Sequence, residues 1–174
     1  MSFKIFINAG HGGIDPGAVS KKGTKEANIT RKVSSLLACQ LIQKGFNVEF
    51  FQQNKTFSEI TKVENNSNSD LFISIHCNSF SDSKANGVEV LHYPNSTKGI
   101  KLAKLVQNEL IDATTLHDRG IKARSDLHVL KRTKATAILI ELAFLSNPEE
   151  EKLLLDEPKV FTDAIAKGIN SFFS

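Results

Sequence analysis

Short runs of apolar and β-branched residues alternate along the chain with longer segments of helical periodicity. In the first such segment Ile29, Val33, Leu37 and Leu41 recur every four residues, which predicts a helix with one buried face, and Gly45 is placed to end it. Further helices are predicted at residues 57–64, 97–110 and 161–172, and residues 147–151 predict the start of another. Strands are predicted at residues 3–8, 46–51, 71–75, 87–93, 127–130 and 136–140. Strands that alternate with helices predict an α/β fold with a largely parallel central sheet.

The composition is that of an ordinary globular domain. The 174 residues are 40% hydrophobic and 24% charged, which excludes a disordered chain, a collagen and a disulfide scaffold. We therefore expect one domain that spans residues 1–174. The net charge of +3 is too small to argue for nucleic acid as a partner. No run approaches the roughly 18 apolar residues of a membrane span, and Lys4 interrupts the apolar start, so we expect no signal peptide.

Polar residues that can carry chemistry follow three of the predicted strands. His11 comes after the first strand, His76 ends the third, and Glu141 ends the last apolar run. Glu26 lies in the first turn of the first helix. Because ligands of parallel sheets bind beyond the carboxyl ends of the strands, we expect these four side chains to meet at one edge.

Two histidines and a carboxylate form a known catalytic zinc set with a fourth position open for water. A further carboxylate can take the proton of that water and return it to a leaving amine. The spacing does not say whether Glu26 or Glu141 is the ligand. Taken alone, each residue has a simpler explanation, since a histidine after a strand is more often structural and Glu26 suits the helix dipole. The glycine loop at residues 10–17 does not have the spacing of a dinucleotide-binding loop.

Four segments resemble the zinc-dependent N-acetylmuramoyl-L-alanine amidases, the type 3 family of bacterial and phage cell-wall hydrolases. They are residues 10–18 (GHGGIDPGA), 25–28 (KEAN), 70–78 (DLFISIHCN) and 140–147 (IELAFLSN). The similarity runs over nearly the whole chain, with the segments in the order of the family. The resemblance implies a single α/β domain with a mostly parallel sheet of about six strands.

The resemblance also implies the roles that the spacing leaves open. His11, Glu26 and His76 would hold Zn²⁺, and Glu141 would be the catalytic carboxylate. The reaction would be hydrolysis of the amide between the lactyl group of N-acetylmuramic acid and L-alanine of the stem peptide, as in an autolysin or endolysin. Two alternatives are another zinc peptidase or deacetylase of the cell wall, and a catalytically silent wall-binding module.

The implied partner is peptidoglycan, and we expect a monomer without a membrane span. The implied place of action is the cell wall, outside the membrane. Because we expect no signal peptide, the chain could remain in the cytoplasm until lysis. A phage lysin, an autolysin and an excised catalytic domain all stay open.

Several other residues carry secondary predictions. Cys77 follows His76, so strand alternation points its side chain to the opposite face, where we expect a core thiol. Cys39 is expected to pack near the apolar face of the first helix, and His128 is expected to face outward from a strand. Residues 119–122 and Arg124 either meet carboxylates of the stem peptide or form a solvated basic loop.

The chain departs from the family pattern at some positions. Residues 52–56 replace a Thr-Arg pair and an acidic residue, so we expect that segment to be remodelled. Ala143 stands where the family often has glycine, which matters if this position requires a positive φ.

Overall fold

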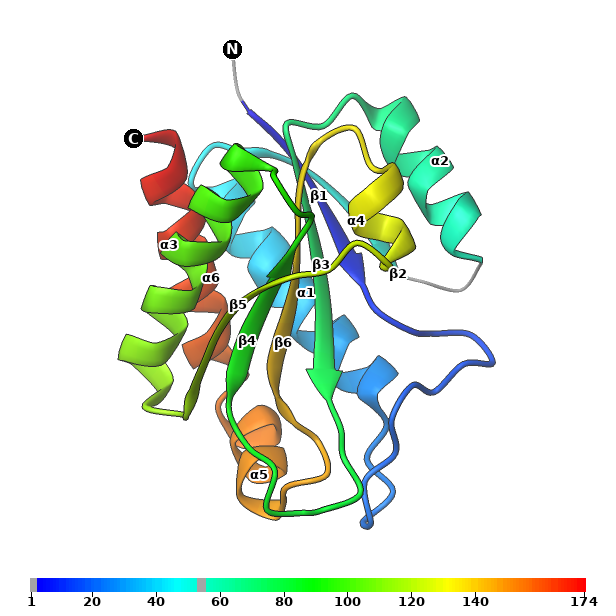
Figure 1. Ribbon diagram of the computed structural model, residues 1–174, viewed down its shortest axis with the longest axis vertical. Helices are drawn as coiled ribbons and strands as arrows, with labels where there is room; N and C mark the ends of the chain where they lie inside the picture. Colours follow the sequence, from blue (N-terminus) through cyan, green and yellow to red (C-terminus); the bar gives the residue numbers. More distant parts are fainter. Residues whose placement is uncertain (1–2, 53–55) are drawn as a thin grey trace.

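The computed structural model describes residues 3–52 and 56–174 as an α/β fold (Figure 1). Within these residues the strands are β1 (Lys4–Ala9), β2 (Asn47–Gln52), β3 (Leu71–Asn78), β4 (Val88–His92), β5 (Asp118–Ala123) and β6 (Thr136–Phe144). The helices are α1 (Glu26–Gln43), α2 (Phe57–Ser67), α3 (Thr97–Thr114), α4 (His128–Arg132), α5 (Pro148–Asp156) and α6 (Pro158–Phe173). Among the described residues, no helix has the length and apolar character needed to cross a bilayer.

The six strands form one sheet in the order β2-β1-β3-β6-β4-β5. The first four in that order run parallel, β4 runs antiparallel to β6, and β5 runs parallel to β4. The prediction of an α/β fold with a mostly parallel sheet of about six strands is confirmed. Because four neighbouring strands point the same way, their carboxyl ends share one edge of the sheet, where ligands bind in open α/β folds.

Helices cover both faces of the sheet to unequal extents. The long helices α1, α3 and α6 pack on one face over the larger core, and the short helices α2 and α4 lie on the other (Figure 1). Side chains of β3 alternate between these cores: Ile73 and Ile75 face the larger one and Phe72 the smaller one. By the same alternation His76 lies on the face of α2 and α4. That face is the less covered one, which leaves room for a ligand.

The helix boundaries follow from the capping residues that the sequence contains. Ser96 precedes α3 and its hydroxyl accepts a hydrogen bond from the Gly99 N–H at 3.2 Å. Asn147 precedes α5, and its side-chain oxygen accepts from two N–H groups of the first turn, with Pro148 at the first helical position. Both helix starts were predicted, and both are confirmed.

The strand predicted at residues 127–130 is wrong. This run leads into the short helix α4, and the strand of this region is β5, which the sequence pattern did not reveal. β5 lies at the edge of the sheet and its residues are partly or fully exposed, so it lacks apolar alternation. Val129 and Leu130 lie in α4 and are both buried, and four residues are too few to distinguish the two periodicities.

Two departures from the family pattern have different outcomes. Of the segment expected to be remodelled, residues 53–55 lie outside the described residues. Ala143 lies inside β6 and is not among the described residues with positive φ, so its side chain causes no backbone strain there.

Candidate metal centre and active site

The four predicted site residues come from four elements that meet at the carboxyl edge of the sheet. His11 follows β1, Glu26 is the first residue of α1, His76 lies near the end of β3, and Glu141 lies in β6. His11, Glu26 and His76 each place one ligand-type atom within 4.8 Å of the others. His76 and Glu141 are direct partners in the register of β3 and β6. The structure therefore brings together the side chains that the sequence singled out.

Glu26 lies between the two histidines. Its Oε1 is 3.2 Å from His76 Nδ1 and accepts a hydrogen bond from the Cys77 N–H at 3.0 Å. Its Oε2 is 3.3 Å from His11 Nε2 and accepts from the Ala18 N–H at 2.9 Å. Burial alone raises the pKa of this carboxyl, but hydrogen bonds from both histidines and the Cys77 N–H outweigh it and hold the pKa well below its usual range. Glu26 is therefore a fixed, buried anion.

The spacing of these atoms suits a tetrahedral zinc ion. In a tetrahedral site with zinc-to-ligand bonds of about 2.0–2.1 Å, two ligand atoms lie about 3.4 Å apart. The Glu26 oxygens lie 3.2 and 3.3 Å from the histidine nitrogens, which matches that ligand-to-ligand distance. The other ring nitrogen of His11, Nδ1, lies 2.8 Å from Asp15 Oδ2, an arrangement that fixes the orientation of a metal-binding imidazole. The donor set of His11, Glu26 and His76 therefore fits zinc.

The glycine loop before α1 permits this close packing. A Cβ on Gly10 would lie 2.3 Å from the His76 ring. Gly17 has a φ of +65°, and a Cβ there would lie 2.6 Å from Glu26 Oε2 and 2.7 Å from the His11 ring. His11 itself has a φ of 60°, a strained value for a residue with a side chain. The loop brings its backbone against the ligand side chains, which only glycine allows at these two positions.

Electrostatic effects within the site distinguish His11 from Glu141. Interaction with Glu26 raises the pKa of His11 to about 9, partly opposed by burial. Burial raises the pKa of Glu141 to about 7. The Oε2 atom of Glu141 is buried and, among the described residues, has no hydrogen-bond partner. An unpaired carboxylate oxygen with a pKa near neutrality is suited to proton transfer.

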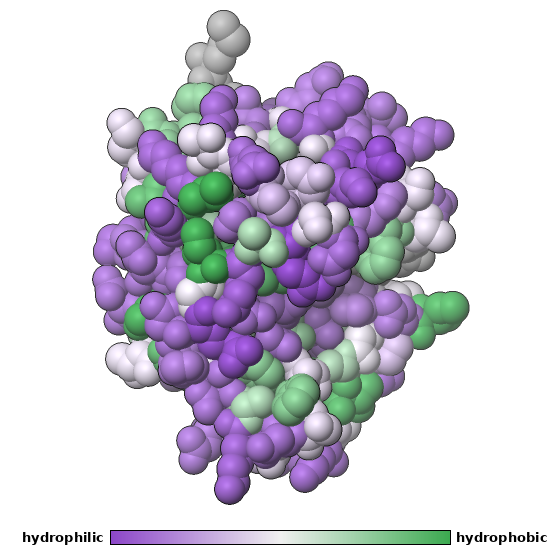
Figure 2. All heavy atoms as spheres, viewed as in Figure 1, coloured by the Kyte–Doolittle hydropathy of each residue, from purple (hydrophilic) through white to green (hydrophobic). Residues whose placement is uncertain are grey.

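A cavity of about 350 Å³ extends from His76 and Glu141 along the face that α2 and α4 leave partly open. Figure 2 shows one side of the molecule, which is largely hydrophilic, with apolar side chains both in its lower part and left of its centre. The remaining lining residues are Phe57, Leu91, Arg124, Asp126, Leu127, His128, Val129 and Leu139. The outward-facing position predicted for His128 is wrong. It starts α4, lines this cavity, and has its Nε2 3.3 Å from the Thr61 hydroxyl.

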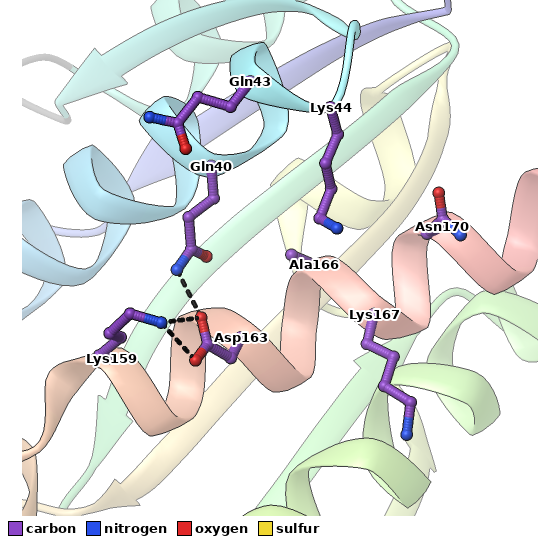
Figure 3. Close-up of a pocket in the computed structure, with 8 residues that line it drawn as sticks. All are labelled: Gln40, Gln43, Lys44, Lys159, Asp163, Ala166, Lys167 and Asn170. Carbon is purple, nitrogen blue, oxygen red and sulfur yellow. Dashed lines mark hydrogen bonds and ion pairs between the residues drawn. The ribbon is translucent and has the colours of Figure 1, made fainter.

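A second hollow of about 520 Å³ lies between α1 and α6 (Figure 3). Three of its polar side chains pair with one another. Asp163 accepts a hydrogen bond from Gln40 at 2.6 Å and forms an ion pair with Lys159. None of the predicted site residues lines this hollow.

The two cysteines differ from each other in burial. Cys77 is buried in the larger core, as predicted, and burial raises the pKa of its thiol. Cys39 is exposed, so the prediction that it packs near the apolar face is wrong. Both thiols are free.

Residues around the centre were not identified from the sequence. Asp15 contacts His11, and Glu89 lies opposite Glu141 in the pairing of β4 with β6. Glu89 accepts hydrogen bonds from Asn78 at 3.1 Å and from Arg119 at 2.9 Å. A signal for Asp15 was present, since it lies four residues after His11 in the glycine loop, whereas the Glu89 contacts depend on the strand order.

A His-Glu-His cluster around a buried carboxylate, beside a second carboxylate with an unpaired oxygen, is typical of metal-dependent hydrolases. The sequence profile described as N-acetylmuramoyl-L-alanine amidase matches residues 5–171. The chain belongs to this amidase family, and the resemblance found in the sequence is confirmed.

Relatives and solved structures support this assignment. The chain is 32% identical over 174 residues to the probable cell wall amidase LytH of Staphylococcus saprophyticus, which covers 98% of the chain and 58% of that protein. It thus spans little more than half of the LytH proteins it matches. It is also 32% identical to the uncharacterized protein YqiI of Bacillus subtilis, with 97% of the chain and 84% of that protein covered.

Among solved structures, the CwlD amidase of Clostridioides difficile, determined with the GerS lipoprotein, superposes with a TM-score of 0.92 at 31% identity. The match covers 99% of this chain and 98% of that one. An N-acetylmuramoyl-L-alanine amidase from Clostridium difficile 630 superposes with a TM-score of 0.91 at 29% identity, covering 99% and 97% of the two chains. The fold is therefore that of the family.

Proposed function

We propose that this chain hydrolyses the amide between the lactyl group of N-acetylmuramic acid and L-alanine in peptidoglycan, with Zn²⁺ held by His11, Glu26 and His76. The single observation that carries the proposal is the unpaired, buried Oε2 of Glu141 beside a donor set with the spacing of a zinc site, in a chain of the amidase family. Zinc, when bound, lowers the pKa of water and polarises a carbonyl group.

Glu141 performs the proton transfers in the proposed reaction. Its Oε2 accepts a proton from the attacking water and then delivers it to the nitrogen of the departing alanine. Burial, which raises the pKa of Glu141, supports both roles because it favours return of the proton to the protein as well as its acceptance. Asp15 orients the His11 ring through Nδ1, which leaves Nε2 directed toward Glu26.

The cavity provides the space for the peptide that departs. It borders His76 and Glu141, and its walls come from the segment that leads into α4. Peptidoglycan is therefore the proposed partner, and the proposed place of action is the cell wall. A monomeric state and a single domain over residues 1–174 stay predictions.

The proposal is tested by digestion of purified peptidoglycan with zinc and after chelation, followed by labelling of new amino termini. The expected result is new N-terminal alanine that appears only with metal. New termini on other residues would favour a zinc peptidase, and released acetate would favour a deacetylase. No product from a zinc-loaded protein would favour a silent wall-binding module.

A further inference from the structure

The cavity beside Glu141 has an apolar floor of defined length. Leu139 lies two residues before Glu141 on β6, and Leu91 of β4 is paired directly opposite Leu139. Both leucines line the cavity. Two strand residues span about 7 Å, which is also the reach of two residues of an extended peptide. A ligand that places its scissile amide at Glu141 therefore carries its next residue to the far end of this floor.

The far end of this floor is bordered by Arg124. The backbone N–H of Arg124 donates to the carbonyl of His92, the residue that follows Leu91, at 2.9 Å. The side chain of Arg124 lines the cavity together with Glu141 and His76. This bond places the backbone of Arg124 beyond the leucine floor as seen from the candidate metal centre.

Asp126 holds the guanidinium in one orientation. Arg124 Nε donates to Asp126 Oδ1 at 2.8 Å, and Nη2 donates to Oδ2 at 2.7 Å. A guanidinium has five N–H donors, so this two-point contact leaves three of them available. Two of these three lie at the edge formed by the two terminal nitrogens, which matches the two oxygens of a second carboxylate. The pair is thus a preoriented site for an anion.

The arginine and lysine side chains near Arg124 either pair with other residues or lie outside the cavity. Arg119 Nε donates to Glu89, and its guanidinium packs over the ring of Phe144 at 4.9 Å. Within the described part of the chain, the cavity lining includes neither Arg119 nor Lys122. Arg124 is the basic side chain that the geometry places against the departing peptide.

We propose that Arg124 is a specificity-determining residue that binds a free carboxylate on the second residue of the stem peptide, the one attached to the alanine. This inference rests on the proposed function, since it assigns the peptide to the cavity beside Glu141. An amide at the same position offers one oxygen and no charge, so it forfeits the two-point contact.

The test compares two soluble substrates that differ only at this group. They are two muramoyl tripeptides in which the γ-carboxyl of the second residue is amide-linked to L-lysine. The α-group of that residue is a free carboxylate in muramoyl-L-alanyl-γ-D-glutamyl-L-lysine and an amide in muramoyl-L-alanyl-D-isoglutaminyl-L-lysine. The ratio of their kcat/KM values is measured for the zinc-loaded wild type, Arg124→Gln, Arg124→Lys and the control Arg132→Gln. The control removes the same charge from an exposed position of α4 that does not line this cavity.

The wild type is expected to prefer the carboxylate substrate about tenfold, the effect of one charge-assisted contact. Arg124→Gln is expected to bring the ratio close to one by raising KM for the carboxylate substrate alone, and Arg124→Lys to give an intermediate ratio. Arg132→Gln should keep the wild-type ratio. A ratio in Arg124→Gln equal to that of the wild type would overturn the inference and leave the amidase function standing. Failure of the zinc-loaded wild type to cleave either substrate would overturn both.

Discussion

Glu64 gives a quantitative prediction that is independent of the metal centre. Its side chain lies on α2, is only 1% exposed, and has an Oε2 without a hydrogen-bond partner among the described residues. Burial raises its pKa from 4.5 to about 7, although N–H groups of Lys134 and Ala135 partly oppose this shift. The folded protein therefore prefers the protonated carboxyl. We expect Glu64→Gln, which cannot ionise, to stabilise the protein at alkaline pH.

The size of the effect follows from the pKa. Because the pKa of Glu64 is higher in the folded than in the unfolded protein, its contribution to the free energy of unfolding is fully present below pH 4.5. That contribution is lost as the pH rises through 7. A shift from 4.5 to about 7 corresponds to at most about 3 kcal/mol at 1.36 kcal/mol per pKa unit. The increase in unfolding free energy of Glu64→Gln relative to the wild type should thus be small near pH 5 and approach about 3 kcal/mol at pH 8. For this chain length it corresponds to an increase in Tm of at most about 6–12 °C.

Urea unfolding of both proteins at pH 5, 6, 7 and 8, with chelator throughout, measures this difference. Asp112→Asn, which removes a carboxylate from an exposed position on α3, serves as the control. Because other groups titrate equally in both proteins, the difference isolates Glu64. An unfolding free energy difference that is the same at pH 5 and pH 8 would refute the argument that the buried charge destabilises the fold.

Three further predictions concern the site and its support. Asp15→Asn should weaken zinc binding about 10- to 100-fold because the His11 ring loses its charged partner, and competition with a chromophoric chelator would measure it; an unchanged affinity would contradict that role. Gly17→Ala should abolish stoichiometric zinc binding, as the added Cβ meets the ligand side chains at 2.6 Å, and metal analysis after gel filtration would decide. Glu150→Ala should destabilise the fold by about 2–5 kcal/mol, because the Glu150 carboxylate accepts hydrogen bonds from the buried N–H groups of Gly87 and Phe144 at 2.7 and 2.6 Å. Urea denaturation would measure this loss. The control Glu149→Ala, at an exposed neighbouring position, should cost about 1 kcal/mol or less in the same assay.

The positions of the four central residues could be predicted because they follow from topology. His76 and Glu141 end apolar runs, and parallel strands bring such ends to one edge. The glycines around His11 were visible in the sequence as a loop. Their purpose was not, because the close approach of Gly17 to Glu26 exists only after α1 has packed.

The errors arose where local pattern was weak or the helical angle was neglected. β5 is an exposed edge strand without apolar alternation, so the short run before α4 was taken for the strand. Cys39 lies two residues after Leu37 in α1, which places it about 200° around the helix from that buried residue, so its exposure follows from helix geometry. The bidentate contact of Arg124 with Asp126 depends on a turn of three residues, and nothing in the sequence periodicity reports it.

The measurement that tests the central claim most directly is the zinc content and turnover of Glu141→Gln. Glu141 is not among the three residues grouped as a metal site, so the account predicts that this variant binds zinc with the affinity of the wild type. Hydrolysis of the muramoyl-alanine amide should fall by about 10²- to 10⁴-fold, because proton transfer at Oε2 is lost. Wild-type turnover in a zinc-loaded Glu141→Gln protein would contradict the assignment of Glu141 as the catalytic carboxylate.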